Sequence, residues 1–181
     1  MTMKALILAP FSTYELCRLR SAVQVEYDSW LDSRRLHSPE ELTERLTAAS
    51  VSILVVEADF VFEETFQQAP CLRLVGVCRG DPANVDVSAA TRCGVAVVNT
   101  PGRNAPAVAE LALGLMLCLA RRIPAAHQVV TSGAWEDPTM PYRSLRGSEL
   151  GGKTLGIVGL GAIGRELAQR GAALGMKVVA H

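Results

Sequence analysis

The 181-residue sequence lacks an excess of charge of either sign. Lys and Arg together number 18, and Asp and Glu together also number 18. Proteins that hold nucleic acid or an anionic membrane by long-range electrostatics carry a basic excess, which this chain does not have. The charge balance therefore argues against a nucleic-acid partner and against a membrane-surface partner.

The sequence also lacks an apolar run long enough to cross a bilayer. Its most apolar run is VAELALGLMLCLA at residues 108–120, and Glu110 lies inside it. A transmembrane helix needs about 20 apolar residues, so this run predicts a buried helix. The first residues, MTMKALILAPF, lack a basic region and a small-residue cleavage site, so they predict a strand and not a signal peptide.

Cysteine pairs and histidine clusters are likewise missing. The cysteines are odd in number and form no CxxC motif, and the three histidines lie far apart in the sequence. We therefore expect reduced thiols that serve as small hydrophobic residues in a cytoplasmic protein, and no metal site. The cysteines are Cys17, Cys71, Cys78, Cys93 and Cys118.

What is present is an alternation of strand and helix signals over the first 100 residues. The continuous apolar runs at 51–57 and 72–78 are typical of strands buried on both faces of a parallel sheet. The alternation predicts a doubly wound α/β domain of the flavodoxin-like kind over residues 1–100. Strands are expected at 4–9, 23–28, 51–57, 72–78 and 95–99, with helices at 12–20, 38–50, 63–69 and 88–93.

Local signals mark where several of these helices begin. Ser38 can cap a helix, Pro39 suits the first helical position, and Glu41 completes a capping box. Asn104 is expected to cap a long helix that runs to about residue 122, where Pro124 would end it. The stretch 131–152 is rich in Gly, Pro, Ser and charge, and it predicts mostly a surface loop.

A second α/β region is expected over residues 101–181, and its central motif is GLGAIG. The glycines stand at 159, 161 and 164, the spacing GxGxxG. Gly159 would permit a tight turn, Gly161 would let a pyrophosphate approach the backbone, and Gly164 would let the helix pack on the strand. The motif follows an apolar strand and opens a helix, which favours dinucleotide binding over a purely structural turn.

The sequence does not show which dinucleotide is preferred. NAD-binding sites carry an acid about 20 residues beyond the glycines, on the second strand. No Asp or Glu lies between Glu166 and His181. These residues alone therefore leave both NAD and NADP open, and the nucleotide domain is expected to be incomplete in this chain.

Two blocks of the sequence resemble the D-isomer-specific 2-hydroxyacid dehydrogenase family. The first, residues 74–120, contains NVD, VVNTPG and VAELALGLML, and the second is GKTLGIVGLGAIGRELAQRGAALGMKV. The resemblance implies an N-terminal substrate-binding domain and a Rossmann domain that binds NAD. It also implies hydride transfer between nicotinamide and C2 of a small 2-hydroxy or 2-oxo acid.

The resemblance also implies site residues. In the family the loop after the 72–78 strand presents backbone N–H groups to the substrate carboxylate, and Val108 and Glu110 open a helix that faces the nicotinamide. Glu110 has an alternative interpretation as a first-turn acid favoured by the helix dipole. The candidate substrate-binding residues are Cys78, Arg79 and Gly80; the candidate cofactor-binding residues are Val108, Gly159, Gly161, Ala162, Ile163 and Gly164.

The family's catalytic arginine, carboxylate and histidine lie downstream of the glycine motif, and nothing here matches them. None of Arg121, His127 and Glu136 falls in a family motif. We therefore expect an N-terminal part of a dehydrogenase that is inactive alone, with a homodimer formed through the apolar helix. The alternative is a non-catalytic dinucleotide-binding or dimerisation module. Asp81-Pro82-Ala83 departs from the family's usual loop, which leaves the substrate open.

Overall fold

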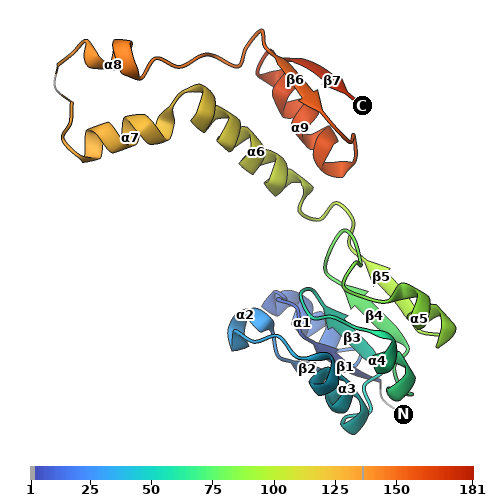
Figure 1. Ribbon diagram of the computed structural model, residues 1–181. Helices are drawn as coiled ribbons and strands as arrows, with labels where there is room; N and C mark the ends of the chain where they lie inside the picture. The colour runs from blue at the N-terminus through green and yellow to red at the C-terminus, as the bar shows by residue number, and fades with distance from the viewer. Residues whose placement is uncertain (1–2, 136) are drawn as a thin grey trace. The chain divides into compact units, whose positions relative to one another are not determined.

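The computed structural model describes residues 3–135 and 137–181. The chain divides into two compact units, Met1–Pro101 and Gly102–His181. Glu136 lies outside the described residues. Figure 1 shows the helices and strands of each unit.

The first unit is built on a five-stranded sheet in which every neighbouring pair is parallel, as the apolar runs predict. The strand order is β2-β1-β3-β4-β5. The chain therefore places β2 on one side of β1, and then adds β3, β4 and β5 in turn on the other side. The strands are β1 (Lys4–Ile7), β2 (Gln24–Tyr27), β3 (Ile53–Val56), β4 (Leu74–Val77) and β5 (Ala96–Asn99).

The helices that the described residues of this unit form are α1 (Thr13–Arg20), α2 (Trp30–Ser33), α3 (Pro39–Ala48), α4 (Glu63–Gln68) and α5 (Val87–Arg92). The capping box of α3 is confirmed, since the Ser38 side chain accepts from Glu41 N–H and the Glu41 carboxylate accepts from Ser38 N–H. Helix α2 was not expected from the sequence. Its four residues are too few to show a helical period, although the Ser29 side chain caps it.

Apolar side chains fill both faces of this sheet. On one face, Leu54 and Val77 pack with Leu42 and Leu46 of α3, with Phe66 of α4 and with the alanines of α5. On the other face, a smaller cluster joins Ala5 and Ile7 of β1 to Leu19 of α1. Because both faces are covered, the strands can be apolar on each side, which explains the continuous runs in the sequence.

The second unit pairs helices with a two-stranded parallel sheet. Strands β6 (Thr154–Ile157) and β7 (Lys177–Ala180) flank α9 (Ala162–Ala173), so the expected strand–helix–strand unit is confirmed. Its core is small, made by Leu155, Ile157 and Met176 with partly buried side chains packed around them. The other helices are α6 (Ala105–Ala120), α7 (Ile123–Thr131) and α8 (Met140–Ser144).

Two expectations about this unit were wrong. Pro124 does not end the long helix: α6 ends at Ala120, and Pro124 stands in the first turn of α7, where a missing N–H costs nothing. Asn104 holds the N-cap position of α6, but its side chain makes no capping hydrogen bond. The stretch 131–152 is mostly irregular, as expected, with α8 as its short helical part.

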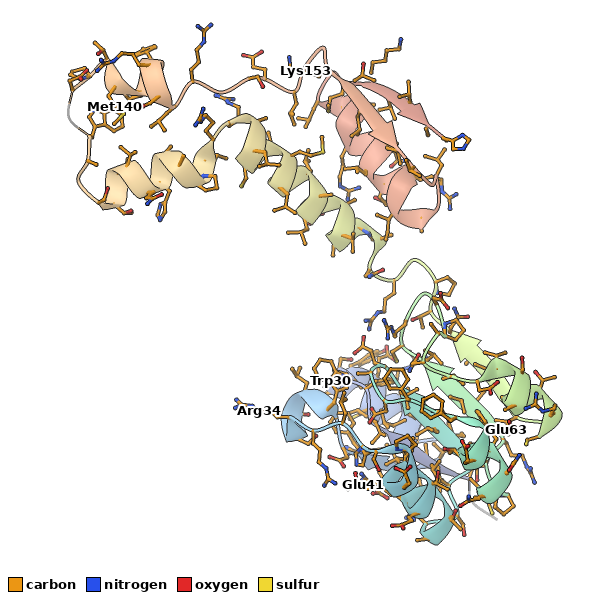
Figure 2. All side chains as sticks on the ribbon, viewed as in Figure 1. Trp30, Arg34, Glu41, Glu63, Met140 and Lys153 are labelled. Carbon is orange, nitrogen blue, oxygen red and sulfur yellow. The ribbon has the colours of Figure 1, made fainter. Side chains whose placement is uncertain are left out.

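Helix α6 carries an exposed apolar face. Leu111, Leu115 and Leu119 are 63%, 57% and 81% exposed, and their spacing of four residues places them on one side of the helix. Side chains project from α6 on the side away from α9 (Figure 2). Among the described residues, no helix combines the length and apolar character that crossing a bilayer would require.

The cysteines depart from the expected role as small core residues. Cys17, Cys71 and Cys93 are exposed, and Cys78 and Cys118 are only half-buried. The apolar neighbours Leu16, Leu72 and Val77 are buried, whereas the cysteines beside them are exposed or half-buried. Apolar sequence context was therefore a poor guide to their burial.

Candidate functional site

The glycine-rich turn between β6 and α9 has the geometry that its spacing predicts. Gly159 has a φ of +90°, in the region that side chains rarely adopt. A Cβ built on Gly164 would lie 2.3 Å from the Gly159 carbonyl oxygen, so only glycine fits where the helix meets the turn. A Cβ built on Gly161 would meet nothing within 4 Å, so the space beside this residue is open.

This turn presents free backbone donors at the start of α9. The first backbone N–H to find a helical acceptor is that of Arg165, which donates to Gly161 C=O at 3.0 Å. The N–H groups of Ala162, Ile163 and Gly164 occupy the first positions of the helix, where no intrahelical acceptor exists. Such N–H groups, together with the positive end of the helix dipole, suit phosphate oxygens.

A cation also stands at this turn, and the sequence patterns did not indicate it. The Arg165 guanidinium donates to the Leu160 carbonyl oxygen at 3.1 Å, which holds the positive charge against the turn. Arg165 is exposed, so its charge is available to a ligand on the open side. An arginine directly after the third glycine was the only signal, because the motif fixes the glycines and not this position.

Helix α6 runs beside α9 in the same direction. The turn before α6 lies against the start of α9, since a Cβ built on Gly102 would be 3.4 Å from the Ala162 Cβ. Further along, the Glu110 carboxylate pairs with the Arg170 guanidinium at 3.5 Å. The start of α6, where Val108 is half-buried, therefore lies at the same end of the unit as the glycine-rich turn.

The structure corrects one interpretation of Glu110, that of an acid in the first turn of the helix; its place facing the nicotinamide stays a prediction. Helix α6 begins at Ala105 and has no acid in its first turn, so the helix dipole does not explain Glu110. Its carboxylate instead contacts Arg170 near the end of α9, away from the glycines. Hydrogen bonds to Glu166, and then to Glu110, raise the pKa of Arg170. The contact with Glu110 links α6 to α9 at an exposed position.

In the first unit, the candidate substrate loop follows β4. The Cys78 N–H donates to the Val56 carbonyl oxygen at 2.8 Å, so it continues the sheet and is not available to a ligand. Within the described part of the chain, the N–H groups of Arg79 and Gly80 have no hydrogen-bond acceptor. Both residues are exposed, so their N–H groups can meet an anion.

The carbonyl groups of this loop are held by the neighbouring strand. The Arg79 carbonyl oxygen accepts from the Thr100 N–H at 2.9 Å, and the Gly80 carbonyl oxygen accepts from the Asn99 side-chain amide at 2.8 Å. Sequence reasoning missed both contacts. They depend on β5 lying beside β4, which the order of strands along the chain does not determine.

A buried polar cluster lies elsewhere in the unit and has a structural role. Asp59 is almost fully buried; its carboxylate accepts from the His37 backbone N–H at 2.9 Å, and its carbonyl oxygen accepts from the Asn84 side chain at 2.7 Å. Asn84 belongs to the NVD element of the sequence. Its side chain therefore ties the segment after the candidate loop to the segment after β3.

The groove between α3 and α4 does not coincide with the candidate residues. A groove of about 890 Å³ lies between α3 and α4, lined by residues that include Glu40, Glu44 and Glu64, and none of the candidate site residues lines it. Residues 3–135 and 137–181 hold no group of three His, Cys, Asp or Glu side chains arranged to bind a metal ion. The candidate sites are thus the two backbone donor loops.

Comparison with known proteins finds one family across both units. A family model described as "D-isomer specific 2-hydroxyacid dehydrogenase, NAD binding domain" matches residues 113–181. The Bacillus subtilis protein YoaD, named provisionally as a 2-hydroxyacid dehydrogenase, is 39% identical over 170 residues, covering 93% of this chain and 49% of YoaD. D-3-phosphoglycerate dehydrogenase of Rattus norvegicus is 43% identical over 144 residues, covering 80% of this chain and 26% of the rat enzyme.

Solved structures agree with these sequence matches. A crystal structure from Polaromonas, described provisionally as an NAD-binding D-isomer specific 2-hydroxyacid dehydrogenase, has a TM-score of 0.84 at 28% identity. The match covers 100% of this chain and 55% of the Polaromonas chain. The chain thus spans about half the length of this structure and of YoaD.

Proposed function

Because this chain belongs to the D-isomer-specific 2-hydroxyacid dehydrogenase family, we propose that it is part of an NAD-dependent oxidoreductase. The reaction is the reversible transfer of a hydride between nicotinamide and C2 of a D-2-hydroxy acid. The observation that carries the proposal is the glycine-rich turn, in which Gly164 is sterically required and the space at Gly161 is open. An enzyme built on such a turn supplies a bound dinucleotide, and the dinucleotide supplies the hydride chemistry.

The second unit, Gly102–His181, is proposed as the beginning of the NAD-binding domain. The N–H groups of Ala162, Ile163 and Gly164 would bind the pyrophosphate, with Gly159 and Gly161 shaping the turn and Val108 lying beside it. Arg165 adds a positive charge against the phosphates. NADP remains the alternative cofactor, because none of these contacts reads the adenosine ribose.

The first unit, Met1–Pro101, is proposed as the substrate-binding domain. Its strand order of 2-1-3-4-5 is the flavodoxin-like order, and such sheets bind ligands beyond the carboxyl ends of their strands. The loop after β4 lies at that edge, so Arg79 and Gly80 would bind the substrate carboxylate through their N–H groups, with Cys78 joining the loop to the sheet. The Arg79 side chain would add charge to the same contact.

Catalysis and assembly are proposals of a different kind, because they rest on resemblance. No family motif for the arginine, carboxylate and histidine occurs in this sequence, so the 181-residue chain is proposed to turn over no substrate by itself. The exposed leucines of α6 support the proposal that this helix forms a homodimer interface. A cytoplasmic location stays a prediction from the sequence.

The proposal is tested by titrating the chain with NAD and following the backbone amides of Gly161, Ile163 and Gly164 by NMR. These amides should shift, and the variant Gly161→Ala should bind NAD on the order of tenfold more weakly, through lost charge-assisted hydrogen bonds. The methyl group meets no atom of the chain, so the fold should be unchanged. The matched control is Gly114→Ala, which adds a methyl group in open space within α6.

Two results would contradict this assignment. Amide shifts confined to residues outside the turn would place the dinucleotide elsewhere. Equal NAD affinity for Gly161→Ala and for the unchanged chain would show that no phosphate approaches Gly161.

A further inference from the structure

We propose that Asn99 and Thr100 are positioning residues for the substrate. From the end of β5 they fix the peptide groups that join Arg79 to Gly80 and Gly80 to Asp81, so that the N–H groups of Gly80 and Asp81 face a substrate carboxylate. This inference rests on the proposed function, specifically on the loop after β4 as the carboxylate site. It adds two residues that the glycine motif and the loop sequence do not indicate.

The contacts come from the register of the sheet. Val77 of β4 pairs with Asn99 of β5, so the residues that follow both strands emerge side by side at the carboxyl edge. The Arg79 carbonyl oxygen accepts from Thr100 twice, from its N–H at 2.9 Å and from its hydroxyl at 3.4 Å. The Gly80 carbonyl oxygen accepts from the Asn99 side-chain nitrogen at 2.8 Å.

Fixing a carbonyl group also fixes the next N–H group. A trans peptide is planar, and its C=O and the following N–H point in opposite directions. The chain has no cis peptide among its described residues. With the Arg79 carbonyl turned toward Thr100, the Gly80 N–H points away from β5. With the Gly80 carbonyl turned toward Asn99, the Asp81 N–H also points away from β5.

Free rotation of these peptides would weaken an anion site. Without partners for its carbonyl groups, an exposed glycine loop can turn a carbonyl oxygen toward the ligand in place of an N–H. A carbonyl oxygen would repel a carboxylate, whereas aligned N–H groups form an anion-binding concavity. The two hydrogen bonds from β5 therefore select the orientation that binds.

The two residues contribute through different atoms, which separates their effects. Thr100 acts mainly through its backbone N–H, which any residue except proline would supply. Asn99 acts only through its side-chain amide, so its contribution depends on the residue type. An aspartate at position 99 would have the same shape but would offer an acceptor to the Gly80 carbonyl oxygen.

The experiment is an NMR titration of the chain with oxamate, a small carboxylate with an adjacent carbonyl group. The unchanged chain should show shifts at the Arg79, Gly80 and Asp81 amides that yield a Kd. Asn99→Ala should raise that Kd roughly fivefold, the value of one ordinary hydrogen bond, with no matching loss of melting temperature. Asn99→Ser should restore part of the affinity through its hydroxyl donor, which a role in stability alone would not explain.

Two control variants sharpen the result. Thr100→Val removes only the longer contact at 3.4 Å and keeps the N–H, so its Kd should change less than twofold. Gln24→Ala removes an exposed side-chain amide at the start of β2 and should bind oxamate like the unchanged chain. Both variants should melt at about the same temperature as Asn99→Ala.

The experiment distinguishes a failure of the proposed carboxylate site from a failure of the positioning role. If oxamate moves neither the Arg79 nor the Gly80 amide of the unchanged chain, the carboxylate site of the proposed function is wrong, and this inference falls with it. If the unchanged chain binds oxamate at this loop and Asn99→Ala binds it equally well, the positioning role is wrong and the proposed function stands.

Discussion

The two units of the chain bury their apolar side chains to very different extents. In the first unit, Leu54, Val56 and Val75 are completely buried between helices on both sides of a five-stranded sheet. In the second unit, the large core side chains of Leu155, Ile157 and Met176 keep 8–9% exposure, and Val158 is 93% exposed. The more deeply buried residues of this unit, Ala105 and Ala109, have small side chains. The first unit thus has a core of its own, whereas the second has little beyond the contact of α9 with β6, β7 and α6.

The difference in burial between the two units fits the different sites proposed for them. A substrate loop needs a rigid edge, and the sheet of the first unit supplies it through two neighbouring strands, β4 and β5. The glycine-rich turn depends on fewer contacts, chiefly the close approach of Gly164 to Gly159. We therefore expect local opening of the second unit at a lower free energy than opening of the first.

The largest expected effect is in the core of the first unit. Leu54→Ala removes a fully buried side chain from β3 and should lower the free energy of unfolding by about 2–5 kcal/mol. Hydrogen exchange of amides in each unit gives the measurement, and the loss should be confined to residues 3–101. Leu115→Ala on the exposed face of α6 is the control, with an expected change within about 0.5 kcal/mol. Equal acceleration of exchange in both units would mean that they unfold together.

The next effect is at the glycine-rich turn. Gly164→Ala would place a Cβ 2.3 Å from the Gly159 carbonyl oxygen and 3.3 Å from the Ile157 side chain. Because backbone must move to relieve the clash, we expect a loss of about 1–3 kcal/mol, visible as faster exchange in α9 and β6. Gly161→Ala, with nothing near its added methyl group, should exchange like the unchanged chain. A stable Gly164→Ala variant would show that the turn is looser than its geometry indicates.

A smaller effect concerns association through α6. If the exposed leucines form a homodimer interface, Leu115→Glu should reduce self-association in sedimentation velocity without lowering the free energy of unfolding by more than about 0.5 kcal/mol. Tyr14→Glu, an equally drastic change at an exposed position of the first unit, is the control and should sediment like the unchanged chain. A monomer at every concentration tested would remove the support for this interface.

The smallest effect is a pH dependence at the start of α3. The Ser38 N–H donates to the Glu41 carboxylate and holds its pKa below the ordinary value, with the nearby Arg35 charge acting in the same direction. A lowered pKa in the folded state stabilises the fold above the unfolded pKa, and this contribution disappears as the pH falls through the folded value. Glu41→Gln should therefore melt below the unchanged chain at roughly pH 7, and the two should converge near roughly pH 3. A constant difference across that range would assign the effect to packing.

The helices and strands that carried strong local signals were predictable from the sequence. The capping residues Ser38, Pro39 and Glu41 predict the start of α3, and the glycine spacing predicts the turn into α9. Helix α7 was missed because a proline can end one helix or begin another, and only the tertiary path decides. Pro124 does the second, after a left-handed residue at Arg122.

The candidate sites were predictable only in part. The loop after β4 was found from its glycine and from resemblance, but the sequence could not show that the Cys78 N–H continues the sheet. It also could not show which residues hold the loop, since the contact from Asn99 to Gly80 joins residues that are 19 positions apart. The roles of the site residues stay predictions until a ligand is measured.

The five cysteines allow local opening of each unit to be measured by thiol labelling. Cys78 lies at the end of β4 in the first unit and Cys118 lies in α6 of the second, both half-buried, whereas Cys17, Cys71 and Cys93 are exposed. An alkylating reagent would label the exposed three at once and the other two at rates set by local opening. Mass spectrometry of the two slow adducts would then time the opening of each unit separately, with no residue changed.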